Sequence, residues 1–183
     1  LGDVYKRQAD GCEEIEGLTV VDVVRRAKME IVMLSITGKK EVTSSHGVTF
    51  LADALAEETG YEDLDGIVLP GGMPGTKNLM ACKPLCDALV QADAAGKRLA
   101  AICAAPMVLG KLGLLKGRKA TCYPSFEQYL EGAECVSEPV VRDGNIITGM
   151  GPGAAMEFAL TIVELLAGKE KVDELAEAMC VKR

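Results

Sequence analysis

The stretch Leu99–Leu115 reads LAAICAAPMVLGKLGLL and shows how the chain folds at its centre. Its first five residues form a short apolar run of the kind found in buried parallel strands. Pro106 then suits the first turn of a helix, where a backbone N–H is not needed. The chain is therefore predicted to turn sharply from strand to helix at Cys103, and the small side chains of Ala104 and Ala105 leave room for such an elbow.

Similar apolar runs predict two more strands of the same sheet, Ile31–Ser35 (IVMLS) and Ile67–Pro70 (IVLP). Amphipathic stretches predict helices at Gly11–Ala27 and Pro84–Ala95, and Gly96 follows the second where a C-cap belongs. Strands that alternate with helices build a parallel sheet with helices on both faces. The predicted fold class is therefore α/β, with a doubly wound, mostly parallel sheet.

A β-hairpin and a long helix are predicted in the C-terminal third. Val140–Thr148 (VVRDGNIIT) places Asp143 and Gly144 between two apolar pairs. This pattern indicates a type I′ turn, because both residues tolerate positive φ. A helix over Gly151–Ala167 follows. Ligands of doubly wound sheets bind beyond the carboxyl ends of the strands, so the residues that follow the central strands are the first candidates for function.

The composition limits the classes of function. The 183 residues are 49% apolar, enough for one domain with a sizeable core. Acidic residues outnumber basic ones by 27 to 20, so nucleic acid is not an expected partner. No apolar run approaches the roughly 18 to 20 residues that span a bilayer and no signal peptide is recognisable, so we expect a cytoplasmic protein without membrane contact. Seven cysteines without C-x-x-C spacing and a single histidine predict reduced thiols, no metal site and no cofactor.

The first eight residues, LGDVYKRQ, do not fit the predicted fold. A first parallel strand should be apolar, yet Lys6–Gln8 is polar. Asp3–Gln8 also matches the translation of a transposon end that is used to prepare sequencing libraries. We therefore expect residues 1–8 to be an adapter-derived segment that replaces the native first strand, and residues 9–183 to form the single domain. A genuine polar strand is the alternative.

Cys103 is the candidate nucleophile. A thiol at a helix N-terminus meets unpaired N–H groups and the positive end of the helix dipole, which should lower its pKa from about 8.5. An inert buried cysteine is the alternative.

The loop Pro70–Gly75 (PGGMPG) follows a neighbouring strand, and its glycines let backbone amides face an anion. Gly11–Glu16 (GCEEIE) adds three carboxylates at a helix start, either as complements of the dipole or with one of them buried and protonated beside the thiol.

Six motifs resemble those of the DJ-1/PfpI superfamily, most closely its DJ-1-like branch with the bacterial ThiJ-type relatives. They are GCEEIE at Gly11–Glu16, VDVVRRA at Val21–Ala27, SSHGV at Ser44–Val48, DGIVLPGGMPG at Asp65–Gly75, AAICAAP at Ala100–Pro106 and GPGAAMEFAL at Gly151–Leu160. The resemblance covers about residues 9–182, and it implies a flavodoxin-like sheet and a homodimer.

The resemblance also implies roles for particular residues. The family's reactive cysteine falls on Cys103 and its protonated glutamate on Glu16. The backbone amides of its anion pocket fall on Gly72 and Ala104. Some relatives keep a histidine near the cysteine where this chain has Tyr123. Without a histidine beside the nucleophile, peptidase activity is not expected.

His46, Tyr123 and Arg26 are candidate contacts to substrate or across a dimer seam. The resemblance implies that the helix of Glu16 and the region of Arg26 and Ser44–Gly47 approach a twofold axis. An exposed or structurally bonded histidine is the alternative for His46.

Two functions fit these residues. The first is a cysteine-dependent glyoxalase or protein deglycase: Cys103 attacks a methylglyoxal-type dicarbonyl, or its early adduct on a protein, while Glu16 moves a proton. The alternative is a redox sensor or holdase chaperone in oxidative stress, in which peroxide converts Cys103 to a sulfinate. A thiazole-phosphate enzyme is a third possibility that no motif supports.

Overall fold

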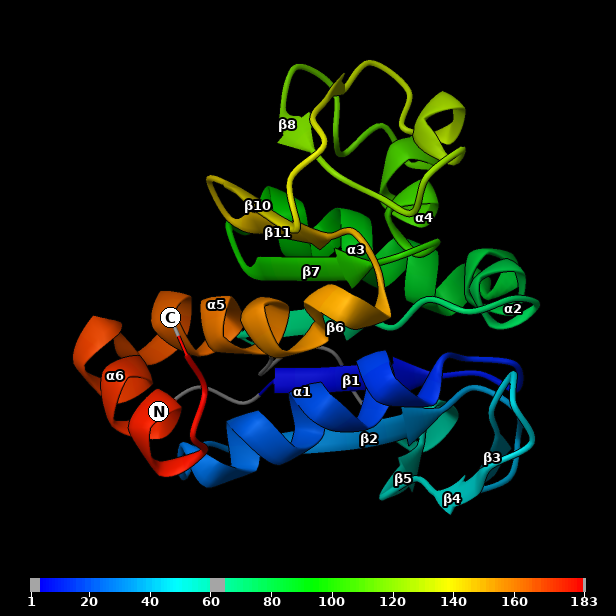
Figure 1. Ribbon diagram of the computed structural model, residues 1–183. Coiled ribbons are helices and arrows are strands. Elements are labelled where there is room, and N and C mark those ends of the chain that lie inside the picture. The colour runs from blue at the N-terminus through cyan, green and yellow to red at the C-terminus, as the bar shows by residue number, and fades with distance from the viewer. Residues whose placement is uncertain (1–3, 60–64, 183) are drawn as a thin grey trace.

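A seven-stranded sheet forms the centre of the molecule (Figure 1). The structure is a computed structural model that describes residues 4–59 and 65–182. The strands lie in the order β10-β11-β7-β6-β1-β2-β5, and all neighbours are parallel except β10 and β11. From the centre, the chain runs to β2 on one side and from β6 to β7 on the other, so the sheet is doubly wound. Its strands are β1 (Val4–Gln8), β2 (Ile31–Ser35), β5 (Ala54–Leu55), β6 (Gly66–Leu69), β7 (Arg98–Ile102), β10 (Val140–Asp143) and β11 (Ile146–Gly149).

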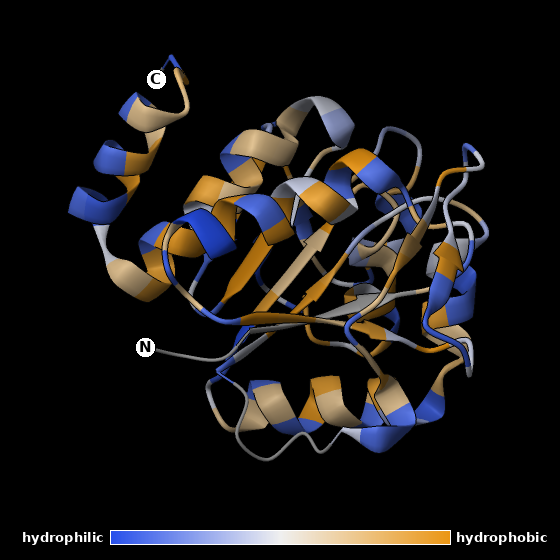
Figure 2. Ribbon diagram, turned by 90° about the horizontal axis from the view of Figure 1, so that it is seen from below, coloured by the Kyte–Doolittle hydropathy of each residue, from blue (hydrophilic) through white to orange (hydrophobic). Residues whose placement is uncertain are grey.

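Helices cover both faces of this sheet (Figures 1 and 2). On one face lie α1 (Glu14–Arg26), α5 (Ala155–Ala167) and α6 (Lys169–Ala178), whose apolar side chains share one buried cluster. On the other face lie α2 (Gly75–Ala81), α3 (Lys83–Ala94) and α4 (Pro106–Lys111), which contribute to a second cluster. No helix in the described part of the chain combines the length and the apolar character needed to cross a membrane.

Two small sheets and three short 3-10 helices complete the described structure. Strands β3 (Glu41–Thr43) and β4 (Thr49–Leu51) are antiparallel, and β8 (Lys119–Ala120) pairs with β9 (Glu134–Cys135) in parallel. The 3-10 helices are η1 (Ala56–Glu58), η2 (Glu127–Tyr129) and η3 (Pro152–Ala154).

The two cores explain why these helices dock on the sheet. Val20 and Val24 of α1 and Phe158 of α5 have no exposed surface, and neither do Leu85 and Leu89 of α3. Burying a side chain of this size stabilises the fold by about 1.5–3 kcal/mol. The alternation of apolar and polar positions along each helix therefore selects the face that packs on the sheet.

The predicted α/β fold is confirmed, and the predicted central strands match β2, β6 and β7 to within one residue. Helix α1 begins three residues later than predicted, at Glu14, because the chain first turns at Gly11, whose φ is +81°. The helix predicted from Gly151 begins as η3 and becomes α-helical at Ala155.

The predicted hairpin forms, but its turn differs from the prediction. Asp143 pairs with Ile146, so the two turn residues are Gly144 and Asn145 rather than Asp143 and Gly144. Gly144 has φ of +60°, whereas Asn145 has no positive φ. Positive φ at the first turn position alone is the pattern of a type II′ turn, so the predicted type I′ turn is wrong.

The N-terminal segment takes the position of a first strand. Val4–Gln8 pairs in parallel with β2 on one side and with β6 on the other. The adapter origin of residues 1–8 and the domain boundary at residue 9 stay predictions, and residues 1–3 lie outside the described part of the chain.

Candidate active site

Cys103 lies at the sharp turn between β7 and α4, as the sequence predicted. Its φ of +65° is a left-handed conformation that a non-glycine residue keeps only where its surroundings hold it. Two backbone hydrogen bonds hold Cys103 in this conformation. The N–H of Cys103 donates to the carbonyl of Gly149 at 2.9 Å, and the carbonyl of Cys103 accepts from the N–H of Tyr123 at 2.8 Å. The residue is only 8% exposed.

Glu16 reaches this elbow from the first turn of α1 and has no exposed surface. Its Oε2 accepts a hydrogen bond from the N–H of Gly71 at 2.8 Å. A Cβ on Gly71 would lie 2.6 Å from the Cβ of Cys103 and 2.7 Å from Glu16 Oε2. Only a residue without a side chain therefore fits at this position, where the thiol and the carboxyl group meet.

The glycine-rich loop after β6 packs tightly on the start of α1. Gly72 has φ of +88°, and a Cβ there would lie 2.4 Å from the backbone N of Glu13. Glu13 donates its N–H to the carbonyl of Gly71 at 2.9 Å, and its side chain caps α1 by accepting from the N–H of Glu16 at 2.7 Å. Because of this packing, the helix that carries Glu16 and the loop that borders Cys103 are fixed relative to each other.

The electrostatics of Cys103 differ from the prediction. Burial, the negative charge of Glu16 and a hydrogen bond with its side chain raise the pKa of the Cys103 thiol to about 12. The backbone N–H groups of Gly72 and Ala104 bond the sulfur and lower this pKa, as a helix N-terminus should, but they are outweighed. The predicted lowering of the thiol pKa is therefore wrong while Glu16 carries its charge.

His46 lies beside the start of α1 rather than in the Cys103 elbow. Its Nδ1 is 3.0 Å from Glu14 Oε2 and 4.0 Å from Glu13 Oε1, and its side chain is 67% exposed. The hydrogen bond with Glu14 and the charge of that carboxylate raise the pKa of His46, and the same hydrogen bond lowers the pKa of Glu14. His46 is therefore exposed and hydrogen bonded to Glu14, and its candidate contact with substrate or across a dimer seam stays a prediction.

Tyr123 is a neighbour of Cys103 through its backbone, and its half-exposed ring packs edge-on against Phe126 at 6.3 Å between centroids. The ring also lines a cavity of about 480 Å³, together with Pro124, Met150, Glu157 and the segment Gly151–Ala154. The candidate contact of Tyr123 with substrate or across a dimer seam stays a prediction.

Arg26 does not lie at this site. It is ten residues along α1 from Glu16, which is about 15 Å at the helical rise. Its Nε instead donates to Asp22 Oδ2 at 2.8 Å on the exposed side of the helix. Arg26 therefore lies away from Cys103 within its own chain, and its candidate contact with substrate or across a dimer seam stays a prediction.

Two residues of the site were missed by sequence reasoning. Gly71 was read only as part of a glycine-rich turn, and Glu13 only as one of three acids at a helix start. The PGG and GCEEIE runs contain both residues. Their roles depend on contacts between segments more than 50 residues apart, such as the bond from Gly71 to Glu16, which no local pattern reveals.

Comparison with known proteins shows which family and which proteins this chain is similar to. The model of the DJ-1/PfpI family matches residues 4–165. Protein DJ-1 homolog B of Arabidopsis thaliana is 40% identical over 95% of this chain and 40% of its own length. Homolog A of the same organism is 39% identical over 45% of its length, so the chain spans less than half of these two relatives.

Two further proteins match over almost their whole length. A Caenorhabditis elegans protein named glutathione-independent glyoxalase is 31% identical over 95% of this chain and 93% of that protein. The structure of oxidised Toxoplasma gondii DJ-1 superimposes with a TM-score of 0.96 at 36% identity and covers both chains completely.

Proposed function

The chain belongs to the DJ-1/PfpI family, and we propose that it is a cysteine-dependent glyoxalase that converts methylglyoxal-type dicarbonyls to 2-hydroxy acids. One observation carries the proposal: Cys103 and a fully buried Glu16 meet across a glycine that has no room for a side chain. The name of the Caenorhabditis elegans relative supports the same chemistry.

In this proposal Cys103 and Glu16 share one proton near neutrality, and that proton resides on Glu16. The sulfur accepts hydrogen bonds from two backbone amides, those of Gly72 and Ala104. Glu16 is also more deeply buried than Cys103. A negative charge is therefore better stabilised on the sulfur, and the carboxylic acid donates a hydrogen bond to it.

The reaction needs no external oxidant or reductant. The Cys103 thiolate attacks the aldehyde carbon, a C–S bond forms, and the carbonyl electron pair moves to oxygen, which takes the proton of Glu16. The resulting hemithioacetal loses its carbon-bound proton to Glu16, which returns it to the neighbouring carbon. The hydroxyl proton moves to the neighbouring oxygen at the same time, so that a thioester forms. Water then releases the acid from the thioester. In sum, methylglyoxal and one water give lactate, and glyoxal gives glycolate.

In this proposal the amides of Gly72 and Ala104, which bond the sulfur, also hold the oxyanion that develops next to it. The cavity beside Tyr123 offers space for a larger substituent on the carbonyl compound. We therefore extend the proposal to early adducts of dicarbonyls with protein amines, which would make the protein a deglycase. We also propose a cytoplasmic location, where the thiol stays reduced.

Dicarbonyl consumption in the absence of amine buffers and added thiols tests the proposal. The native chain should consume methylglyoxal and release lactate, and Cys103→Ala should abolish both. Cys180→Ala is the matched control, because Cys180 is exposed and lies near the C-terminus. Equal rates for the native chain and Cys103→Ala would refute the enzymatic function.

The amide pair at Cys103 also favours a second function, in oxidative stress. Two equivalents of peroxide convert the thiolate to a sulfinate and release two waters, and the same N–H groups and the Glu16 proton would stabilise the product. The oxidised protein would then act as a sensor or holdase chaperone. Mass spectrometry after mild peroxide treatment should find the two-oxygen adduct on Cys103 before any other cysteine. Its appearance elsewhere first would exclude this function.

A further inference from the structure

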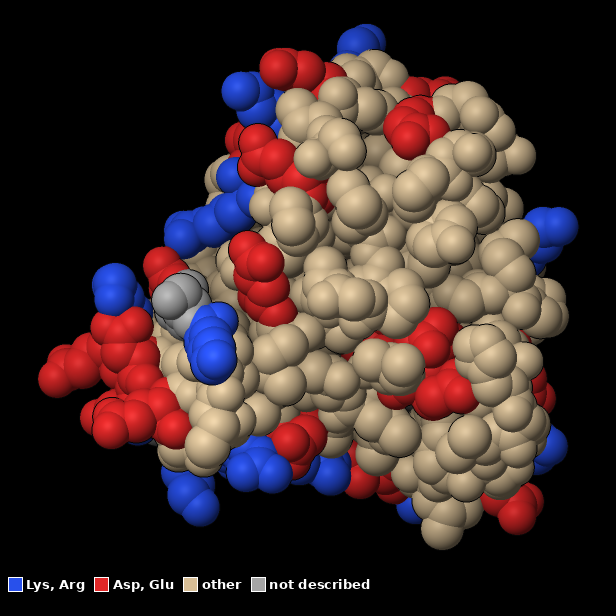
Figure 3. Space-filling model, in the orientation of Figure 1, with Lys and Arg blue, Asp and Glu red and all other residues tan. Residues whose placement is uncertain are grey.

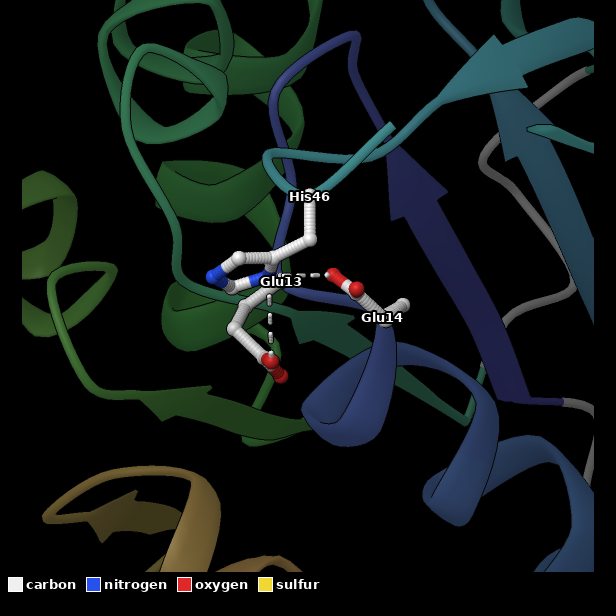
Figure 4. A group of neighbouring side chains, drawn as sticks. All are labelled: Glu13, Glu14 and His46. Carbon is white, nitrogen blue, oxygen red and sulfur yellow. Dashed lines mark hydrogen bonds and ion pairs between the residues drawn. The ribbon is translucent and has the colours of Figure 1, made fainter. Parts of the chain in front are cut away.

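A second cluster of ionisable side chains lies next to the Cys103–Glu16 pair but is not part of it. Glu13 and Glu14 at the start of α1 and His46 in the loop between β3 and β4 point toward one another (Figure 4). One donor atom from each side chain can be chosen so that all three lie within 4.8 Å of one another. Among the described residues, this is the group that could hold a metal ion.

Backbone hydrogen bonds hold the segments of these three side chains together without a ligand. The N–H of Ser45 donates to the carbonyl of Cys12 at 2.8 Å, and the N–H of Gly11 donates to the carbonyl of Thr43 at 2.8 Å. These bonds join the loop of His46 to the segment that carries both glutamates. The side chain of Glu13 is further fixed, because it is buried and its Oε2 caps α1 at the N–H of Glu16. Its Oε1 faces the imidazole at 4.0 Å.

We propose that Glu13, Glu14 and His46 bind a divalent transition-metal ion of the zinc type. Carboxylate oxygens and imidazole nitrogen bind Zn²⁺ at about 2.0–2.2 Å, which sets neighbouring tetrahedral ligands about 3.4 Å apart. The distances of His46 Nδ1 to Glu14 Oε2 and to Glu13 Oε1 are 3.0 and 4.0 Å, on either side of that value. A small rotation of the exposed imidazole brings both distances close to that value.

The donor set decides the class of metal. Imidazole favours Zn²⁺ and its neighbours in the first transition row over Mg²⁺ and Ca²⁺, which prefer oxygen ligands alone. With three protein ligands, one coordination position stays open to water, as in catalytic rather than structural zinc sites. An exposed His–Glu ion pair contributes little stability, so the contact between His46 and Glu14 does not compete strongly with a metal.

The single histidine of the chain provides a direct test. We expect Zn²⁺, titrated into the metal-free full chain, to shift the imidazole NMR signals of His46 and to saturate at micromolar concentrations. Zinc that binds to cysteine thiols would leave these signals in place. Glu14→Gln and Glu13→Gln should each weaken the affinity at least about tenfold, the lower end of the loss seen when even outer-shell partners are removed.

Glu174→Gln is the control, since Glu174 is also a glutamate in an ion pair, but it is exposed and lies on α6. It should leave the zinc affinity unchanged. Three results would overturn the proposal: imidazole signals that do not move while zinc binds, saturation only at millimolar zinc, or equal affinities of the native chain and Glu14→Gln. None of these results depends on Cys103, so the glyoxalase proposal stands or fails separately.

Discussion

At the scale of single residues, the absence of a side chain at Gly71 lets Cys103 and Glu16 lie close together. In Gly71→Ala the new methyl group would meet Cys103 Cβ at 2.6 Å and Glu16 Oε2 at 2.7 Å. Because both neighbours are buried, we expect them to be pushed apart, with a loss of stability of about 1–3 kcal/mol and of most methylglyoxal turnover. Turnover should be compared with the native chain, and thermal unfolding also with Gly153→Ala, where no atom lies within 4 Å of the added methyl. Full activity of Gly71→Ala would show that close contact of the pair is not needed.

The reactivity of the thiol depends on which of Cys103 and Glu16 carries the proton that they share. If Glu16 holds it, the native chain contains a Cys103 thiolate near neutrality. Glu16→Gln replaces the acid with a weaker donor, so the pKa of the thiol should rise by roughly one unit, or about 1.4 kcal/mol. The thiolate fraction at pH 7 then falls, and the alkylation rate of Cys103 falls with it. If Glu16 is instead the ionised partner, the substitution removes a negative charge and alkylation at pH 7 becomes faster, which would contradict the proposal.

At the scale of elements, the junction of α5 and α6 depends on one backbone conformation. Gly168 ends α5 and begins α6 with φ of +85° and ψ of 168°, a region that is essentially restricted to glycine. No atom lies within 4 Å of an added Cβ there, so Gly168→Ala introduces backbone strain without a clash. We expect a loss of unfolding free energy of about 1–3 kcal/mol with unchanged reactivity of Cys103. Gly153→Ala again serves as control, and an equally stable Gly168→Ala would show that the junction adapts.

The elements also show what sequence patterns predict and where they fail. Strands β2, β6 and β7 were found because buried parallel strands are short apolar runs. The polar segment Val4–Gln8 forms β1 although its composition argued against a strand, since pairing with two neighbours overrides propensity. Strands of two or three residues, such as β8 and β3, are too short for any periodicity.

In the candidate site too, local features were predictable from the sequence, whereas contacts between distant segments were not. The elbow at Cys103 was predictable because small residues and a proline mark it locally. The pKa of the thiol was not, because it depends on the distance to Glu16 and on burial. The approach of His46 to Glu14 joins residues 32 positions apart and has no local signature either.

At the scale of the whole molecule, charge and apolar surface are unevenly distributed. Figure 3 shows charged side chains gathered around α6, and areas with few charges over the start of α5 and over β3 and β4, with acidic side chains between these two areas. Four exposed apolar side chains come from α1 and the β3–β4 region, with exposed fractions of 53% for Ile15, 36% for Leu18, 46% for Val48 and 65% for Leu51. The bond from Ser45 to Cys12 joins these two segments. Exposed apolar patches of this kind mark association sites, so we propose that a second copy of the chain covers them.

A charge in this patch should separate the two copies. Leu51→Glu places a carboxylate on the most exposed of these side chains, and its burial against an apolar partner surface is unfavourable. We expect sedimentation to show a dimer of the native chain at micromolar concentration and at least about tenfold weaker association of the variant, which corresponds to about 1.4 kcal/mol. Val90→Glu is the matched control, because Val90 is 44% exposed but lies on α3, on the opposite face of the sheet. A monomeric native chain, or equal weakening by Val90→Glu, would show that these apolar side chains do not form the contact.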